Sequence, residues 1–246
     1  MWVKGKHYFL IKKLLPHETI IFVSLKYFVM IKLVVFDLDG TLLNTIADLA
    51  NSTNYALKQN GFPTHDVEEY YYFVGNGINK LFERALPEAC RTDADVLRIR
   101  QSFLPHYDAH NMDDSSPYPG IPALLETLQQ RGILLAVASN KYQAAAERLV
   151  AHFFPTCSFV QVLGQREGVP TKPDPTIVHD ILRVAGVAPE ETLYVGDSGV
   201  DMATALNSGA VACGVTWGFR PRQELEHFHP AYIVDDPQEI LPICSC

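Results

Sequence analysis

Short apolar runs recur along most of this chain and are separated by stretches with helical patterns. Six runs have the length and the continuous apolar character of buried parallel strands: residues 33–36, 133–138, 159–163, 193–195, 211–215 and 232–234. Four helical stretches lie between most of them: residues 122–131, 141–152, 174–186 and 200–208. Strands that alternate with helices predict an α/β fold, with a doubly wound parallel sheet covered by helices on both faces.

Residues 46–115 interrupt this alternation. They contain four helical patterns and no convincing strand: residues 46–60, 66–73, 76–86 and 93–110. The alternation returns after the polar, proline-containing stretch DDSSPYPG, which ends at Gly120. We therefore expect an α-helical cap domain, residues 46–115, inserted into an α/β core made of residues 31–45 and 116–246. The hinges are expected near residues 44–46 and 115–120.

Residues 1–30 differ in character from the rest of the chain. They are basic and apolar, but no apolar run is long enough to span a bilayer because Lys26 interrupts the best stretch. Their lysines and short apolar centre are not followed by a small-residue cleavage pattern. Met30 stands just before the first predicted strand, so we favour an upstream extension or a misassigned start. A weak secretion or membrane-anchoring signal is the alternative.

The composition is that of an ordinary globular protein with an acidic surplus. The 246 residues are 48% hydrophobic and 20% charged, and the formal net charge is −8. Nucleic acids and anionic membranes bind basic patches, so neither is an expected partner of this chain. Any phosphate site must therefore rest on a few local donors, on a metal ion, or on both.

Five cysteines are scattered along the chain, at positions 90, 157, 213, 244 and 246. Their odd number and irregular spacing argue against a disulfide framework and favour a reducing compartment, the cytoplasm. No second Cys or His pair at metal-ligand spacing lies near Cys244 and Cys246. We interpret these two residues as part of an exposed tail rather than as a metal site.

Polar residues follow several of the predicted strands. In an open parallel sheet, ligands bind beyond the carboxyl ends of the strands. The residues expected to meet there are Asp37, Asp39, Ser139, Asn140, Lys172, Asp197 and Asp201. Each one alone is commonly a helix cap, a turn residue or a surface group. Together they form a cluster of carboxylates, which repel one another unless a cation neutralises them, and carboxylate oxygens suit Mg²⁺.

These residues also resemble, in order, the four motifs of the haloacid dehalogenase superfamily. The motifs are Asp37-Leu38-Asp39-Gly40-Thr41, then Ser139, then Lys172, then Gly196-Asp197-Ser198 followed by Asp201. The resemblance extends from residue 31 to about residue 240 and includes a helical cap between the first two motifs. It implies a Rossmann-like core with an inserted α-helical cap domain.

The resemblance implies a role for each carboxylate. Asp37 would be the nucleophile that attacks phosphorus and forms an aspartyl-phosphate. Asp39 would protonate the leaving oxygen and then activate the water that cleaves the intermediate. Mg²⁺ would be held by an Asp37 carboxylate oxygen, the Asp39 backbone carbonyl and Asp197, while Asp201 would orient the metal site from nearby.

The resemblance also implies a set of residues that hold the substrate. Ser139 and Lys172 would hold the phosphoryl oxygens, assisted by Asn140 and by backbone amides near residues 38–40. Lys172 would in addition offset the negative charge around Asp37. Gly40 would let the chain turn closely against the phosphate, and Thr41 belongs to the same substrate-binding motif.

Asp39 narrows the activity that the resemblance implies. Dehalogenases of the family lack this second aspartate, phosphonoacetaldehyde hydrolases have alanine there, and cation-pumping ATPases have threonine. We therefore expect a Mg²⁺-dependent phosphatase that acts on a small phosphorylated metabolite, as a monomer or a homodimer. The alternatives are a sugar phosphomutase similar to β-phosphoglucomutase, a pyrophosphatase, and, with less support, a phosphate-binding protein without catalysis.

The predicted cap bears on the choice of substrate. Its segment FVGNGINKLFERAL resembles the Gly-x-Gly cap segment of phosphoglycolate phosphatases. Gly75, Asn76 and Gly77 are therefore candidate substrate-binding residues, and 2-phosphoglycolate is the favoured substrate. A plain turn before a helix explains the two glycines equally well. Phosphomutases usually carry a basic cap residue for a second phosphate, and Lys80 leaves that alternative open.

Overall fold

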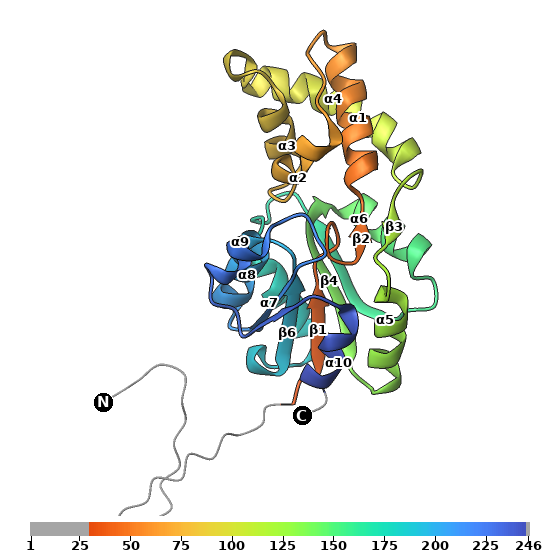
Figure 1. Ribbon diagram of the computed structural model, residues 1–246, viewed down its shortest axis with the longest axis vertical. Helices are drawn as coiled ribbons and strands as arrows, with labels where there is room; N and C mark the ends of the chain where they lie inside the picture. The colour runs from red at the N-terminus through yellow and green to blue at the C-terminus, as the bar shows by residue number, and fades with distance from the viewer. Residues whose placement is uncertain (1–29, 245–246) are drawn as a thin grey trace, which may run out of the picture.

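A six-stranded parallel sheet forms the centre of the protein, in the order β5-β4-β1-β6-β7-β8. The computed structural model describes residues 30–244 of the chain. The strands are β1 (Leu33–Phe36), β4 (Leu134–Tyr142), β5 (Phe159–Gln165), β6 (Thr192–Gly196), β7 (Val211–Val215) and β8 (Tyr232–Val234). The chain winds outward from β1 to β5, returns to β6 beside β1, and winds the other way to β8 (Figure 1). The predicted doubly wound α/β fold is confirmed.

Helices cover both faces of this sheet because its central strand is apolar on both sides. In β1, Val34 and Phe36 belong to the apolar cluster of α5, α6 and α10, whereas Leu33 and Val35 belong to that of α7, α8 and α9. The helices are α5 (Ile121–Gln130), α6 (Gln143–Phe153), α7 (Thr176–Ala185), α8 (Gly199–Ser208), α9 (Arg222–Glu226) and α10 (Ile240–Ile243). A strand that is buried on both faces explains the unbroken apolar run in the sequence.

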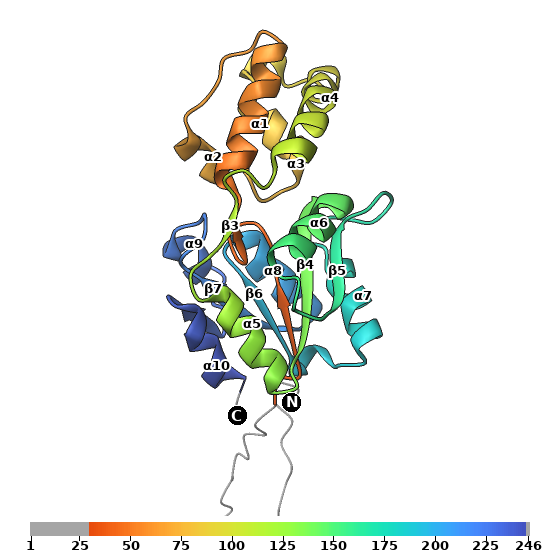
Figure 2. The same ribbon diagram turned by 90° about the vertical axis from the view of Figure 1, so that its right-hand side faces the viewer.

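Four helices stand apart from the sheet and pack around an apolar cluster of their own (Figures 1 and 2). They are α1 (Ile46–Gln59), α2 (Val67–Phe73), α3 (Ile78–Ala85) and α4 (Asp93–His110). Tyr70, Phe82, Phe103 and Tyr107 are fully buried among them. This group is the expected helical cap, and it lies beyond the carboxyl ends of the sheet strands.

A two-stranded antiparallel ribbon carries the chain into and out of the cap. Strand β2 (Leu43–Asn44) pairs with β3 (Ser116–Pro117). The buried Asp48 of α1 holds the two crossings together, because its carboxylate accepts hydrogen bonds from the backbone amides of Asp114 and Ser115, at 3.0 and 2.9 Å. The predicted hinges overlap this ribbon, and the division of the chain into separate domains stays a prediction.

The end of β4 differs from the sequence-based prediction. A helix was expected to begin at Lys141, but the strand continues to Tyr142 and α6 begins at Gln143. Tyr142 pairs with Gln165 of β5 after an irregularity in the ladder. Glycine at position 164 permits this close approach, since a Cβ there would lie 2.5 Å from the carbonyl oxygen of Lys141. The extension matters because it turns the Lys141 side chain toward the sheet edge.

The C-terminal end of the described chain also differs from expectation. Cys244 was interpreted as part of an exposed tail, but it is buried, with 7% of its surface exposed, in the same apolar cluster as Ile240. Cys244 is the C-cap residue of α10, four positions after Ile240, so the two residues face the same side of this short helix. Cys246 lies outside the described residues.

Three short 3₁₀ helices complete the part of the chain that the structure describes: η1 (Glu88–Cys90), η2 (Pro189–Glu191) and η3 (Pro237–Glu239). No helix within residues 30–244 combines the length and the apolar character needed to cross a membrane. The interpretations of residues 1–30 concern a segment of which only Met30 is described, so they stay predictions.

Candidate active site

A pocket lies between the carboxyl edge of the sheet and the cap. Its core side is lined by Asp37, Asp39, Ser139, Asn140, Lys141, Asp197, Ser198, Phe219 and Arg220, and its cap side by Leu49, Val74, Gly75, Gly77, Ile78 and Leu81. The core residues lie within the carboxyl end of β4 or just after β1, β6 and β7, at the sheet edge where a parallel sheet binds its ligands. The pocket therefore contains both predicted catalytic carboxylates.

Three carboxylates form a buried cluster at this edge. Oxygens of Asp37, Asp197 and Asp201 all lie within 4.8 Å of one another. Burial, and next the charge of Asp201, raise the pKa of Asp37 to about 7, although Lys172 opposes the shift. Burial, and next the charges of Asp201 and Asp37, raise the pKa of Asp197 well above its ordinary value. A cation among these oxygens would remove that repulsion.

The donor set fits a divalent cation. Asp37 Oδ1 is buried and no hydrogen bond of good geometry reaches it from the described residues. Lys172 Nζ lies 2.9 Å away as an ion pair and donates hydrogen bonds to three other oxygens. An orphaned buried oxygen within a cluster of carboxylates is the arrangement that a hard metal ion with oxygen ligands would complete.

Lys172 is fixed behind Asp37 rather than exposed to the pocket. Its ammonium group donates to Asp201 Oδ1 at 2.7 Å, to the Ala138 carbonyl at 3.0 Å and to the Tyr194 hydroxyl at 3.0 Å. Burial disfavours its charge, but Asp201 and Asp37 hold the pKa of Lys172 well above its usual value. Lys172 is placed to offset the charge of Asp37, and its predicted contact with phosphoryl oxygens stays a prediction.

Asp201 anchors this arrangement from the first turn of α8. Its Oδ1 accepts the hydrogen bond from Lys172, and its Oδ2 accepts hydrogen bonds from the backbone amide of Ser198, at 3.1 Å, and from the Ser198 hydroxyl, at 2.5 Å. The bonds to Ser198 are half of a capping box that starts the helix. Because both oxygens already have partners, Asp201 is placed to orient the cluster from behind.

Asp197 is held from two sides. The backbone amide of Phe219 donates to its Oδ2 at 2.7 Å, and the Thr41 hydroxyl donates to its Oδ1 at 3.3 Å. Gly40 has φ +88°, and a Cβ there would lie 2.4 Å from Asp197 Oδ2. Gly40 and Thr41 therefore shape the position of Asp197. Neither lines the pocket, so their assignment to the substrate stays a prediction.

Asp39 has a different set of partners from Asp37. Its Oδ1 accepts a hydrogen bond from the Thr45 hydroxyl at 2.7 Å, and Lys141 Nζ lies 2.9 and 3.1 Å from its two oxygens. The Lys141 side chain is 2% exposed. Its ammonium group also lies 4.9 Å from the ring centre of Tyr107 in the cap. Two carboxylates two residues apart thus have different lysine partners, Lys172 for Asp37 and Lys141 for Asp39.

Ser139 and Asn140 line the pocket as predicted, at the end of β4. The Ser139 hydroxyl accepts a hydrogen bond from the Lys141 amide at 3.2 Å. Asn140 ties three segments together, since its Nδ2 donates to the carbonyls of Gly75 and Lys172, at 3.1 and 3.2 Å, and its Oδ1 accepts from the Lys172 amide at 2.9 Å. Asn140 therefore joins the cap turn to the lysine loop.

The cap turn contributes two of its three candidate residues. Gly75 and Gly77 line the pocket, with φ angles of +120° and +83° that favour glycine. Asn76 does not line it, and its Oδ1 accepts a hydrogen bond from Arg84 at 2.7 Å. Lys80 lies outside the lining as well, paired with Glu83 at 2.6 Å and 55% exposed. Lys80 is thus not placed for a second phosphate.

Sequence-based reasoning missed three residues on the core side of the pocket, Lys141, Phe219 and Arg220, as well as the apolar residues on its cap side. Lys141 stands two positions after Ser139, so it would point to the same side if the strand continued, and that spacing was the available signal. Phe219 and Arg220 follow β7, another strand that ends at the same edge. Their positions in the sequence do not reveal which residues they contact, because these contacts join residues far apart in the chain.

Comparisons with known proteins agree on the family. Residues 34–215 match the model of the haloacid dehalogenase-like hydrolases. A phosphoglycolate phosphatase of Mannheimia succiniciproducens is 33% identical over 218 residues, which cover 86% of this chain and 97% of the relative. A phosphoglycolate phosphatase of Mesorhizobium japonicum is 34% identical over 205 residues, with 82% and 89% covered.

Solved structures are similar over the same part of the chain. A crystal structure from Lactobacillus delbrueckii subsp. bulgaricus, provisionally assigned as a phosphoglycolate phosphatase, has a TM-score of 0.81 at 33% identity and covers 87% of this chain and 98% of its own. One from Haemophilus somnus, described as a predicted phosphoglycolate phosphatase, has a TM-score of 0.81 at 32% identity and covers 87% and 97%. This protein belongs to the haloacid dehalogenase-like hydrolases.

Proposed function

We propose that this protein is a Mg²⁺-dependent phosphatase that hydrolyses a small phosphomonoester through an aspartyl-phosphate on Asp37. The observation that carries the proposal is the separation of partners between Asp37 and Asp39. Asp37 lies within the acidic cluster with Lys172 behind it, and Asp39 lies against Lys141 and Thr45. Asp37 is thereby placed at the proposed metal site, and Asp39 lies in the pocket outside that cluster, where we propose that it exchanges protons with the leaving group and with water.

In the proposed reaction, Asp37 attacks phosphorus in line with the leaving oxygen, and Asp39 gives that oxygen a proton. Asp39 then takes a proton from the water that attacks the aspartyl-phosphate, so it returns to its protonated form for the next turnover. The ammonium group of Lys172 offsets the negative charge of Asp37 in each step. The Ser139 hydroxyl and the backbone amide of Asn140 are proposed to donate to the phosphoryl oxygens.

The metal is proposed to be Mg²⁺, held by Asp37, Asp197 and the backbone carbonyl of Asp39. When bound, it would neutralise the phosphoryl oxygens and the carboxylates that surround them. Support for this comes from the buried Asp37 oxygen, which has an ion pair but no hydrogen bond, and from the raised pKa values of Asp37 and Asp197, which a bound metal ion would lower.

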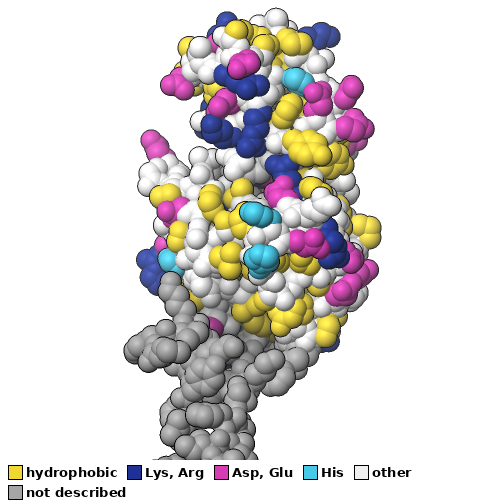
Figure 3. Space-filling model, turned by 60° about the vertical axis from the view of Figure 1, so that its left-hand side comes forward, with side chains coloured by type: hydrophobic (Ala, Val, Ile, Leu, Met, Phe, Trp, Pro, Cys, Tyr) yellow, Lys and Arg dark blue, Asp and Glu magenta, His cyan; other side chains and the backbone are white. Residues whose placement is uncertain are grey.

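We further propose 2-phosphoglycolate as the substrate. The core residues bind only the phosphoryl group, so the choice of leaving group falls to the cap. The turn at Gly75 and Gly77 lines the pocket and leads into α3, whose N-terminal backbone amides we propose to bind an anionic leaving group. Lys and Arg side chains gather on the cap near its junction with the core (Figure 3), which favours approach of an anion. The names of the relatives point to the same compound.

A comparison of catalytic efficiencies tests the substrate. Purified protein with Mg²⁺ is assayed by phosphate release from 2-phosphoglycolate, a hexose phosphate, pyrophosphate and a nucleoside monophosphate. We expect kcat/KM to be highest for 2-phosphoglycolate, because the pocket is small and its cap side offers amides rather than a second phosphate site. A higher value for pyrophosphate or for the hexose phosphate would overturn the substrate and leave the phosphatase chemistry in place.

Removal of residues 1–29 is expected to leave kcat and KM within about twofold of the full chain. Every candidate site residue and the whole described fold lie in residues 30–244. The truncated and full chains are compared by phosphate release and by thermal melting. A truncated protein that melts normally but has lost activity would place residues 1–29 in the site.

We also propose a cytoplasmic location for this protein. The four cysteines among the described residues are all free, which is typical of a reducing compartment.

A further inference from the structure

The loop that follows β7 is pressed against the acidic cluster. The backbone amide of Phe219 donates to Asp197 Oδ2 at 2.7 Å. A Cβ on Gly218 would lie 2.3 Å both from Asp197 Cβ and from the Gly40 carbonyl oxygen, so only glycine permits this approach. The loop is therefore fixed to the proposed metal site immediately before it reaches Arg220.

Arg220 crosses from this loop to the carboxyl end of cap helix α2. A helix leaves its last carbonyl groups without partners inside the helix. Arg220 donates to the carbonyl of Tyr71 through Nη1, and through Nη2 to those of Val74, at 2.9 Å, and Tyr72, at 3.4 Å. A cation at this end is also favoured by the helix dipole. A core residue thus caps a helix of the cap.

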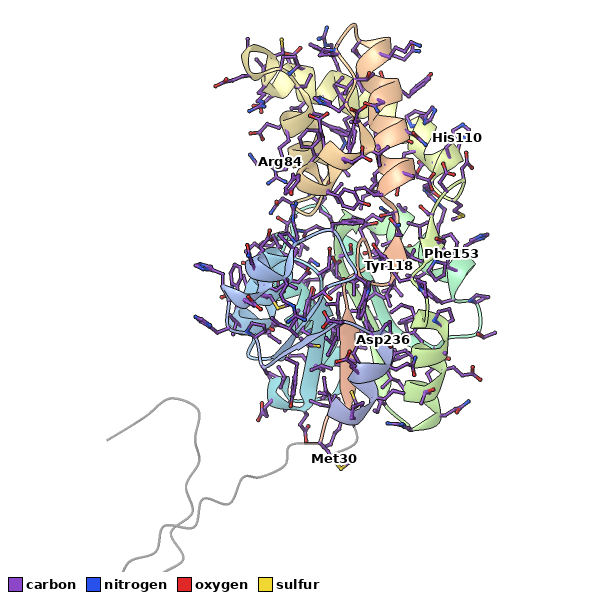
Figure 4. All side chains as sticks on the ribbon, in the orientation of Figure 1. Met30, Arg84, His110, Tyr118, Phe153 and Asp236 are labelled. Carbon is purple, nitrogen blue, oxygen red and sulfur yellow. The ribbon has the colours of Figure 1, made fainter. Side chains whose placement is uncertain are left out.

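Arg84 caps the same helix end from within the cap. Its Nη1 donates to the carbonyls of Phe73, at 2.9 Å, and Tyr72, at 3.3 Å. Figure 4 labels Arg84 where the cap approaches the core. The two arginines together provide partners for the terminal carbonyls of α2, but Arg84 belongs to the cap itself. Of the pair, only Arg220 joins the cap to the core.

A second polar bridge between core and cap differs in its exposure. Asp108 of α4 accepts hydrogen bonds from Tyr142 and from Arg148 of the core. The side chains of Arg148 and Asp108 are 42% and 45% exposed, whereas that of Arg220 is 11% exposed. Exposed ion pairs contribute little, and buried hydrogen bonds to a charged group contribute more. Arg220 also lines the pocket, and Arg148 does not.

We propose that Arg220 is a positioning residue that latches helix α2 and the cap turn at residues 75–77 onto the loop that holds Asp197. The short loop after β7 makes both contacts: the Phe219 amide binds Asp197, and the Arg220 side chain binds the end of α2. Closure of the cap and positioning of Asp197 are therefore coupled. Phe219 reinforces the latch, since it packs in the apolar cluster of the cap with its ring centre 5.6 Å from that of Tyr71.

The consequence concerns which nucleophile reaches the phosphoryl group, and it rests on the proposed aspartyl-phosphate. A closed cap keeps outside nucleophiles away from the intermediate. When the latch is lost, an alcohol such as glycerol can compete with water. Its oxygen bonds to phosphorus, the bond from phosphorus to the Asp37 oxygen breaks, and Asp39 takes the alcohol proton. The products are glycerol phosphate and the free Asp37 carboxylate.

The test measures this competition in the full chain with Mg²⁺, p-nitrophenyl phosphate and glycerol. Nitrophenol counts every turnover and inorganic phosphate counts only hydrolysis, so the excess of nitrophenol over phosphate is the amount of phosphoryl group transferred to glycerol. Arg220→Met is expected to raise the ratio of transfer to hydrolysis roughly tenfold, because the closed cap loses the stabilisation of about one hydrogen bond to a charged group. Arg148→Met, the same substitution at the exposed bridge, should leave the ratio at the wild-type value. Arg84→Met should also leave it unchanged.

Small-angle scattering supplies a readout that does not depend on catalysis. Arg220→Met should have a larger radius of gyration than wild type, and Arg148→Met should not. If Arg220→Met does not fold, Arg220→Lys takes its place, because lysine keeps the charge but cannot bridge several carbonyls. A folded Arg220 variant with wild-type ratio and size would overturn the latch, and so would an equal effect of Arg84→Met, which would show helix capping alone. A wild-type protein that hydrolyses neither p-nitrophenyl phosphate nor 2-phosphoglycolate would instead overturn the proposed phosphatase.

Discussion

Replacing Asp37 with asparagine is expected to lower the rate of phosphate release by roughly 10⁴-fold or more, the scale seen when an enzyme loses its nucleophile. An amide is too weak a nucleophile to attack phosphorus, and no other carboxylate takes its place. Asp39 is held by Lys141 and Thr45, and Asp201 has partners on both oxygens. The fold should persist because asparagine keeps the volume and Asp201 keeps its ion pair with Lys172.

The measurement is single-turnover and steady-state phosphate release, with mass spectrometry of the same sample to exclude deamidation back to aspartate. Asp113→Asn is a matched control, since it makes the same substitution at an exposed carboxylate of the cap that pairs with His110. The control should have wild-type activity and both variants should melt cooperatively. Substantial turnover by a folded, undeamidated Asp37→Asn protein would remove Asp37 from the role of nucleophile.

Removal of the metal is expected to have an effect of similar size. Without the metal, the negative phosphoryl oxygens would meet the carboxylates of Asp37 and Asp197 with no ion to neutralise them, and burial and Asp201 raise the pKa of Asp37 to about 7, so that about half of it is also protonated at neutral pH and cannot attack. Mg²⁺ would favour the ionised form and restore activity. Ca²⁺ should inhibit, because it is larger, takes more ligands and can draw both oxygens of Asp37 onto itself.

Titration of chelator-treated protein with each ion checks this expectation. Activity should appear with Mg²⁺, disappear with chelator, and fall when Ca²⁺ is added to the Mg²⁺ form. The melting temperature should also rise with Mg²⁺, because an ion that binds only the folded state stabilises it by about 2.7 kcal/mol at 100 times its Kd. Full activity in excess chelator would refute the metal site and leave Asp197 as a structural residue.

The sheet was predictable from sequence because burial of a strand between two layers of helices leaves a short, continuous apolar run that can be read locally. β1 is buried on both faces, so its residues had to be continuously apolar, and the polar residues that follow it had to lie at the carboxyl edge. The same rule brought Asp37, Ser139 and Asp197 to one pocket. The helical cap was predictable too, because residues 46–115 lack any apolar run of strand character.

The partners of the site residues were not predictable, because they depend on contacts between distant parts of the chain. Lys141 and Asp39 are 102 positions apart, and their ion pair exists only because β4 continues beyond the apolar run. The sequence placed Lys172 at the carboxyl edge of the sheet, but it did not show where the lysine side chain points. Asp201 and Tyr194 draw it behind Asp37 and away from the pocket. The latch at Arg220 likewise joins segments 146 to 149 positions apart.

The steric course at phosphorus tests the central claim most directly, because it separates a phosphoenzyme from direct attack by water whether or not the intermediate accumulates. An isotopically chiral thiophosphate monoester is hydrolysed in labelled water, and the configuration of the product is determined. Transfer to Asp37 and then to water makes two in-line displacements, each of which inverts phosphorus, so the account predicts net retention. Net inversion would mean a single displacement by water and would contradict an aspartyl-phosphate on Asp37.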